Sequence, residues 1–278
     1  MKAGVVFGGV AVSLLLGMPV WAQQPLRTGV DGTFAPHALP RLPSGVEGFN
    51  VDLANEIARR MKRPIQIDAV QFSGLIPGMN AGTYDFIATP VTVTKDRADS
   101  MLFTEGYIDT DFQFIVKKDA PAIKSLEALK GKVLAVNKGT TLEVWARPLS
   151  DKYGWTVETF GSTTDAIQAL ISNRATTMLT NNSAAAWLVK NNKALELSYL
   201  HKLGTVFGIP VRKDNVALRN QIEVALECMK KDGFIVKIHE KWLGFTPPAG
   251  STATTPSPGF GVPGMPGYDP TPHQPTCS

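Results

Sequence analysis

The chain has 278 residues, more than the roughly 150 residues of a typical single domain, so its length favours one large domain or two medium lobes. Apolar residues make up 44% of the sequence and charged residues 19%, a composition that excludes disorder as a description of the whole molecule. The formal net charge is +4 and the basic residues are spread along the chain, so we expect no nucleic-acid partner.

The amino terminus has the pattern of a secretory signal peptide. Lys2 precedes an apolar run from Val5 to Val20, and Ala22 offers a small residue at the cleavage point. The run is too short for a comfortable membrane span, and no later segment approaches about 18 uninterrupted apolar residues. We therefore predict a signal peptide over residues 1–22 and a mature protein in the periplasm.

Between Leu26 and Gly244, short β-type runs alternate with amphipathic helical stretches, which is typical of parallel sheets flanked by helices and predicts the α/β class. Asn50 is a candidate N-cap for a helix in which Leu53 and Ile57 recur at four-residue spacing. The elements predicted in this part are a helix from 50, a strand over 65–70, a short helix over 73–82 and a strand over 84–89.

The same alternation restarts after Lys118 and turns back near Thr205, so the chain crosses twice between two lobes, which indicates a hinge. We predict a discontinuous first lobe, 25–115 plus 207–245, and a second lobe, 116–206. Helices are expected over 125–129, from 140, and over 164–173, 183–190, 215–231 and 235–242, and strands over 132–137, 155–160, 175–180 and 205–211.

From Thr246 onward Pro and Gly dominate, and such a segment buries too little apolar surface to offset its ordering entropy, so we expect residues 246–278 to be disordered. The run from Gly259 to Gly264 matches the dinucleotide-binding fingerprint in form, but it lacks the flanking strand and helix. The two cysteines leave two alternatives open, namely one disulfide between Cys228 and Cys277, or a buried Cys228 thiol with Cys277 in the tail.

Candidate binding residues follow the carboxyl ends of the predicted strands, where α/β proteins bind ligands. Three loops qualify: Asp31–Phe34, Thr89–Thr92 with Arg97 shortly after, and Gly139–Thr141. The Arg97 guanidinium, with the nearby Thr92 hydroxyl, offers donors for a carboxylate. The alternative is a surface ion pair between Arg97 and Asp99 or Glu105.

No catalytic machinery is predicted. The sequence has no Gly-x-Ser-x-Gly elbow, no histidine pair at metal-binding spacing and too few cysteines for a metal cluster. Asp31 is a possible base, but no second acid accompanies it. We therefore predict no catalytic residue, no metal and no cofactor.

Seven segments, in this order and spacing, resemble the periplasmic polar amino acid binding proteins, which are the substrate receptors of ABC importers. Singly each segment is weak, but together they span almost all of residues 26–244. The segments are Gly29–Phe34, Gly48–Ala54, Phe72–Pro77, Thr92–Arg97, Ser125–Gly131, Gly139–Thr141 and Glu240–Gly244.

The resemblance implies two Rossmann-like lobes joined by two hinge strands, the periplasmic binding protein type II architecture, which close over a solute. It also implies a monomer that reversibly binds an amino acid or related small carboxylate for an ABC transporter permease in the inner membrane. Carried over by position, Arg97 binds the ligand carboxylate with Thr92 and Thr141, Phe34 and Phe72 flank the ligand, and Asp31 and Asn137 face its side chain. Thr89, Pro90, Thr140 and Asn181 complete the predicted site.

Two departures from the family pattern leave the ligand open. The family uses an aspartate on the ligand α-ammonium group where this chain has Asn181, and an amide supplies a weaker bond than a carboxylate. Pro90 stands where the family usually has a small residue. Two alternatives remain: an enzyme resembling the cyclohexadienyl and arogenate dehydratases of the same fold, or a sensory partner of a membrane receptor. The dehydratases need an acid in the cleft, and none is found around Asn181.

Overall fold

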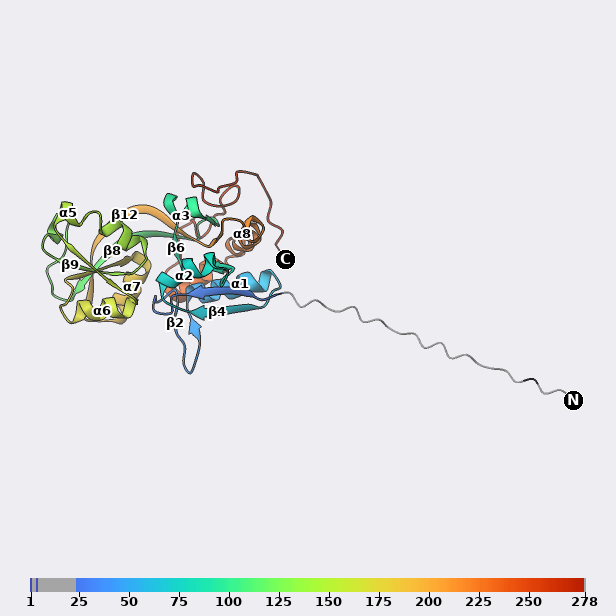
Figure 1. The fold of residues 1–278 in the computed structure, drawn as a ribbon, viewed down its shortest axis with the longest axis horizontal. Helices are drawn as coiled ribbons and strands as arrows, with labels where there is room; N and C mark the ends of the chain where they lie inside the picture. The colour runs from blue at the N-terminus through green and yellow to red at the C-terminus, as the bar shows by residue number, and fades with distance from the viewer. Residues whose placement is uncertain (2–3, 5–23, 278) are drawn as a thin grey trace.

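The computed structural model describes Met1, Gly4 and residues 24–277 of the chain. The predicted signal peptide over residues 1–22 therefore lies almost entirely outside the described residues. The rest forms two lobes side by side, one with α1, α2 and α8, the other with β9, α5 and α6 (Figure 1). Among the described residues, no helix is both long and apolar enough to cross a bilayer.

The first lobe contains a five-stranded sheet in the order β4-β1-β5-β13-β7. Strand β1 pairs in parallel with β4 and β5, whereas β13, which returns from the second lobe, pairs antiparallel with β5 and β7. The strands are β1 (Leu26–Val30), β4 (Ile65–Ala69), β5 (Phe86–Ile87), β7 (Met101–Phe103) and β13 (Pro210–Arg212), and the helices are α1 (Phe49–Arg60), α2 (Phe72–Asn80), α3 (Lys95–Ser100), α8 (Val216–Lys231) and α9 (Phe234–Leu243). A hairpin of β2 (Leu39–Pro40) and β3 (Val46–Glu47) extends from this lobe.

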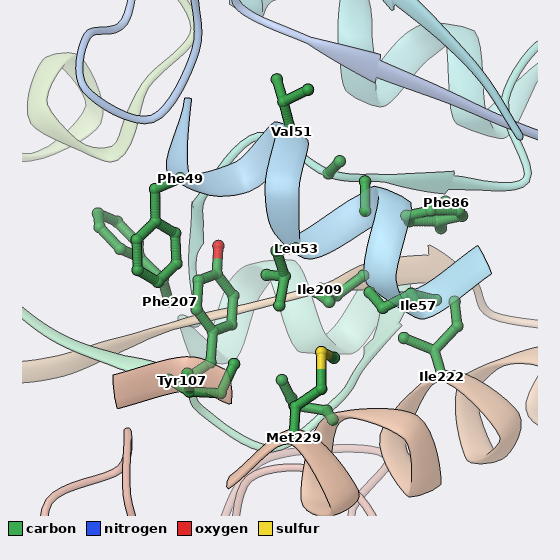
Figure 2. Close-up of a cluster of buried hydrophobic side chains, with 14 of the residues drawn as sticks. Phe49, Val51, Leu53, Ile57, Phe86, Tyr107, Phe207, Ile209, Ile222 and Met229 are labelled. Carbon is green, nitrogen blue, oxygen red and sulfur yellow. The ribbon is translucent and has the colours of Figure 1, made fainter. Parts of the chain in front are cut away.

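Helix α1 is the centre of the first core. Phe49, Leu53 and Ile57 lie one turn apart and are at most 1% exposed. Figure 2 shows Leu53 and Ile57 pointing toward Met229 and Ile222 of α8, and Phe49 lying beside Tyr107 and Phe207. Burial of each such side chain contributes about 1.5–3 kcal/mol. The predicted N-cap is wrong: the helix starts after Gly48, and the Asn50 side chain donates instead to the Ala88 carbonyl and the Tyr107 hydroxyl.

The second lobe contains a six-stranded sheet in the order β10-β9-β11-β8-β12-β6. Its elements are β8 (Ile108–Lys117), β9 (Val133–Asn137), β10 (Thr156–Phe160), β11 (Thr177–Asn181), β12 (Leu195–Gly208), α4 (Thr141–Ala146), α5 (Ser150–Tyr153), α6 (Thr163–Ile171) and α7 (Asn182–Asn191). Strand β6 (Val91–Thr92) pairs with β12 at the edge of this sheet but belongs to the first lobe, where Val91 packs with Phe72 and Ile87. The helix expected over 125–129 is a single 3-10 turn, Glu127–Leu129.

Two long antiparallel strands, β8 and β12, run from one lobe into the other and supply the two hinge strands (Figure 1). The α/β class and the two-lobed architecture are thereby confirmed. The boundaries at 115/116 and 206/207 stay predictions, and both fall inside these strands, since a hinge strand belongs partly to each lobe.

The structure differs from the expected disordered tail, because residues 246–277 pack along α8 of the first lobe (Figure 1). Cys228 and Cys277 form a disulfide, which decides between the two alternatives for the cysteines. Buried side chains of α8 also bind the tail backbone: the Gly261 N–H donates to Glu223 at 2.6 Å, and Arg219 donates to the Gly267 carbonyl at 3.1 Å. A composition argument counts apolar surface alone, so it misses order created by a covalent bridge and by buried polar side chains.

Candidate functional site

A small cavity of about 30 Å³ lies between the lobes, where the loops after β1, β9, β10 and β11 meet the β6–α3 segment. All the predicted site residues except Thr89 line it. The lining residues are Asp31, Phe34, Phe72, Pro90, Thr92, Arg97, Asn137, Thr140, Thr141, Leu142, Thr163, Met178, Leu179, Thr180 and Asn181. A larger groove of about 680 Å³ beside Arg63 and Gln221 contains none of them and opens broadly to solvent.

Thr89 does not line the cavity but contacts the Asp31 loop that forms one of its walls. The Thr89 side chain is 1% exposed, and its hydroxyl accepts a hydrogen bond from the Asp31 backbone N–H. Thr89 thus fixes the loop that carries Asp31.

Arg97 is a partly buried cation that faces the second lobe. Its guanidinium donates to the Thr92 carbonyl at 3.1 Å and, across the cleft, to the Gly139 carbonyl at 3.4 Å, and lies 5.7 Å from the centroid of the Phe72 ring. Burial lowers the pKa of Arg97 to about 10, so the group is still charged at neutral pH.

The alternative surface pair for Arg97 is not formed. Asp99 pairs with Lys95 at 2.9 Å, and Glu105 pairs with Lys230 at 2.8 Å in the interior. Among the ion pairs of the described residues, none involves Arg97. A desolvated guanidinium that lacks a carboxylate from its own chain favours an anionic partner.

Hydroxyl groups from both lobes lie around the guanidinium end of the cavity. The Thr141 hydroxyl donates to that of Thr92 at 3.3 Å across the cleft, and the Thr140 hydroxyl donates to the Asn137 carbonyl at 2.7 Å. Thr140 also caps α4, because its oxygen accepts from the Glu143 N–H. These hydroxyls are neutral donors within reach of a group bound at Arg97.

Hydrogen-bond acceptors collect around Asp31. One Asp31 oxygen accepts from the backbone N–H and the hydroxyl of Thr33, at 3.0 and 2.7 Å, and the other accepts from the Asn137 amide at 3.0 Å. The Asn137 amide oxygen and the Thr163 hydroxyl oxygen are buried without a hydrogen-bond partner among the described residues. Leaving a buried acceptor without a hydrogen bond costs about 1–3 kcal/mol. The geometry therefore favours a ligand that brings N–H donors to the Asp31 end of the cavity.

Asn181 ends β11 and lines the cavity. Its side-chain N–H donates to the Thr110 hydroxyl at 3.0 Å, so the amide oxygen is the acceptor left for a ligand. The aromatic rings of Phe34 and Phe72 complete the apolar walls.

Sequence reasoning missed five lining residues, of which Thr163 was within reach. It begins α6 directly after β10, so the rule that selects loops at strand ends would have included it. Leu142, Met178, Leu179 and Thr180 carry no comparable signal, because apolar and strand residues of this kind usually belong to a core.

This chain is similar to known proteins over most of its length. The family model of the bacterial extracellular solute-binding proteins, family 3, matches residues 26–245. An L-arginine-binding protein of Pseudomonas aeruginosa is 26% identical over 253 residues, which cover 88% of this chain and 98% of that protein. The solved structure of an ancestral arginine-binding protein bound to arginine superimposes with a TM-score of 0.75 and 34% identity, over 80% of this chain and 99% of that one.

A third similar protein bears on the enzyme alternative. It is an ancestral amino acid-binding protein described as a precursor of cyclohexadienyl dehydratase, and its structure matches with a TM-score of 0.73 and 30% identity. The match covers 79% of this chain and 95% of that one.

Proposed function

This chain belongs to the bacterial extracellular solute-binding proteins of family 3, and from that premise we propose that it is the periplasmic substrate-binding component of an ABC importer. It binds an amino acid or a related small carboxylate reversibly between its lobes and delivers it to an inner-membrane permease. The observation that carries the proposal is Arg97, a partly buried guanidinium in the cleft that no carboxylate of the described residues neutralises. No covalent step is required of the site.

The ligand carboxylate binds at Arg97. The planar guanidinium offers a bidentate fork, and the hydroxyls of Thr92 and Thr141 supply further donors from opposite lobes. Because the Thr141 hydroxyl belongs to the second lobe, a carboxylate bound at Arg97 and Thr141 contacts both lobes and favours their closure.

The other end of the ligand carries N–H donors. The Asp31 carboxylate, the unpaired Asn137 oxygen and the Thr163 hydroxyl form an acceptor set that suits a guanidinium, ammonium or amide group. Two of the similar proteins are described as binding arginine, which has this distribution of charge. We therefore propose an amino acid with a donor-bearing side chain, its α-ammonium group facing the Asn181 amide oxygen.

The dehydratase alternative receives less support. Asp31 is the single acid among the cavity-lining residues, and both its oxygens already accept hydrogen bonds from Thr33 and Asn137. A general acid must protonate a leaving group, and this carboxylate is held as an acceptor. The sensory alternative uses the same binding site, but the closed protein would bind a membrane receptor instead of a permease.

The test is calorimetric titration of the mature protein with L-arginine, L-lysine, L-glutamine and 5-guanidinopentanoate, which lacks the α-amine, with Arg97→Ala alongside. Wild type should bind one or more of the amino acids, and Arg97→Ala should weaken binding at least about thirtyfold, since truncating one partner of a buried charged pair costs about 2–5 kcal/mol. Lys95→Ala, in the same helix but paired with exposed Asp99, is the matched control. If Arg97→Ala binds as wild type does, or if prephenate is turned over, the proposal fails.

A further inference from the structure

A buried histidine lies at the junction of the two lobes, outside the cavity. His37 follows β1 in the first lobe and is 0% exposed. Its Nε2 atom lies 2.8 Å from the hydroxyl of Ser183, which belongs to α7 of the second lobe. This contact joins the lobes without using a residue that lines the cavity.

The surrounding hydrogen bonds fix the protonation of His37. The amide nitrogen of Asn50 donates to Ala88 and Tyr107, so the Asn50 oxygen, 2.9 Å from His37 Nδ1, is an acceptor. Nδ1 must therefore carry a hydrogen, and in the neutral ring Nε2 is the acceptor. The Ser183 hydroxyl consequently donates to Nε2 across the interface.

The backbone holds His37 firmly in this place. Its carbonyl accepts from the Asn50 N–H at 2.9 Å, and the loop passes so close to α1 that a Cβ on Gly48 would lie 2.5 Å from the His37 oxygen. Gly48 also has a φ of 142°, which other residues rarely adopt. The loop therefore presents the imidazole in one fixed orientation.

The imidazole also contacts a wall of the cavity and a hinge strand. It stacks on Phe34, a cavity wall, with ring centroids 5.1 Å apart, and meets the edge of Phe207 on hinge strand β12 at 5.8 Å. One side chain thus contacts the binding site, the hinge and the opposite lobe.

We propose that the hydrogen bond between His37 and Ser183 is a closure latch, which forms whenever the lobes close, with or without a ligand, and which protonation of His37 opposes. The inference rests on the proposed function, because it assigns a role in ligand-driven closure. His37 acts here as a positioning residue and does not touch the ligand.

The expected pH dependence follows from burial. In the closed form, burial lowers the pKa of His37 from 6.5 to about 4. The titratable groups that face it are His239 of α9, which lowers the pKa further, and the Tyr107 phenol behind Asn50, and no ion pair of the described residues involves His37. Because the closed form binds fewer protons than an open form with a solvated imidazole, closure is favoured above pH 6.5 and weakens as the pH falls toward 4.

The test is L-arginine titration between pH 5 and 7.5 on wild type, Ser183→Ala and His37→Gln. Wild type should bind up to roughly thirtyfold more weakly at pH 5 than at pH 7.5, as the two pKa values of His37 require. Ser183→Ala should weaken binding about fivefold at pH 7.5, because one hydrogen bond is lost, and His37→Gln should flatten the pH profile. The matched controls are Ser172→Ala and His201→Gln. The Ser172 hydroxyl donates to the Ala169 carbonyl within the second lobe and makes no hydrogen bond across the cleft to any described residue.

A second readout does not depend on the ligand. Nitroxide labels on exposed Gln66 and Lys193, one in each lobe, report the distance between the lobes in the free protein. Longer distances at pH 5 and in Ser183→Ala support the latch even if L-arginine does not bind, in which case the proposed ligand class is what fails. If L-arginine binds at pH 7.5 while Ser183→Ala and acid change neither affinity nor distance, the latch is overturned and the proposed function stands. Unchanged distances without L-arginine binding overturn both.

Discussion

The disulfide between Cys228 and Cys277 determines how much stability the tail contributes to the first lobe. The two residues are 49 positions apart, so the bridge closes a loop of about 50 residues, for which chain entropy gives about 4 kcal/mol of stabilisation at 25 °C. Opening it also frees the tail from Glu223 and Arg219, which then lose buried partners. We expect Cys277→Ala to lower the free energy of unfolding by about 4 kcal/mol.

The assay is urea unfolding of oxidised wild type, of Cys277→Ala and of wild type with a reductant, followed by circular dichroism. Thr276→Ala is the matched control, since it changes an exposed neighbour and leaves the bridge intact. The reasoning is refuted if both Cys277→Ala and the reduced wild type lose less than about 1 kcal/mol relative to this control, because the tail would then be a passive attachment.

Two further predictions concern single side chains. Asn181→Asp should increase the affinity for L-arginine about tenfold, since a charge-assisted bond to the α-ammonium group adds about 1.4 kcal/mol. It should leave the affinity for 5-guanidinopentanoate, which lacks that group, unchanged. Equal affinity changes for the two compounds in calorimetry would contradict the role assigned to Asn181. Burial raises the pKa of Glu223 from 4.5 to about 8, so its contribution to stability is complete below pH 4.5 and is lost as the pH rises through 8. Glu223→Gln should therefore unfold in more urea than wild type at pH 9, and a lower midpoint would show that the carboxylate is stabilising.

Much of the fold and the site follows from local sequence. The alternation of strand and helix patterns over residues 26–244 predicts two α/β lobes, because the period of apolar residues depends on local backbone geometry. The loops that carry Asp31, Thr92 and Thr141 were selected because α/β proteins bind ligands beyond the carboxyl ends of strands, and the family resemblance added Asn137; all four residues line the cavity.

The tertiary structure alone decided how distant charges pair. From the sequence, Arg97 could pair with Asp99, with Glu105 or with a ligand. In the structure Asp99 forms an ion pair with Lys95, and Glu105 forms one with Lys230. Likewise, the disulfide joins Cys277 of the tail to Cys228 in α8, 49 positions away, and the His37 contact with Ser183 joins residues 146 positions apart. Pairing and burial depend on which surfaces meet in space, and no local pattern of residues contains that information.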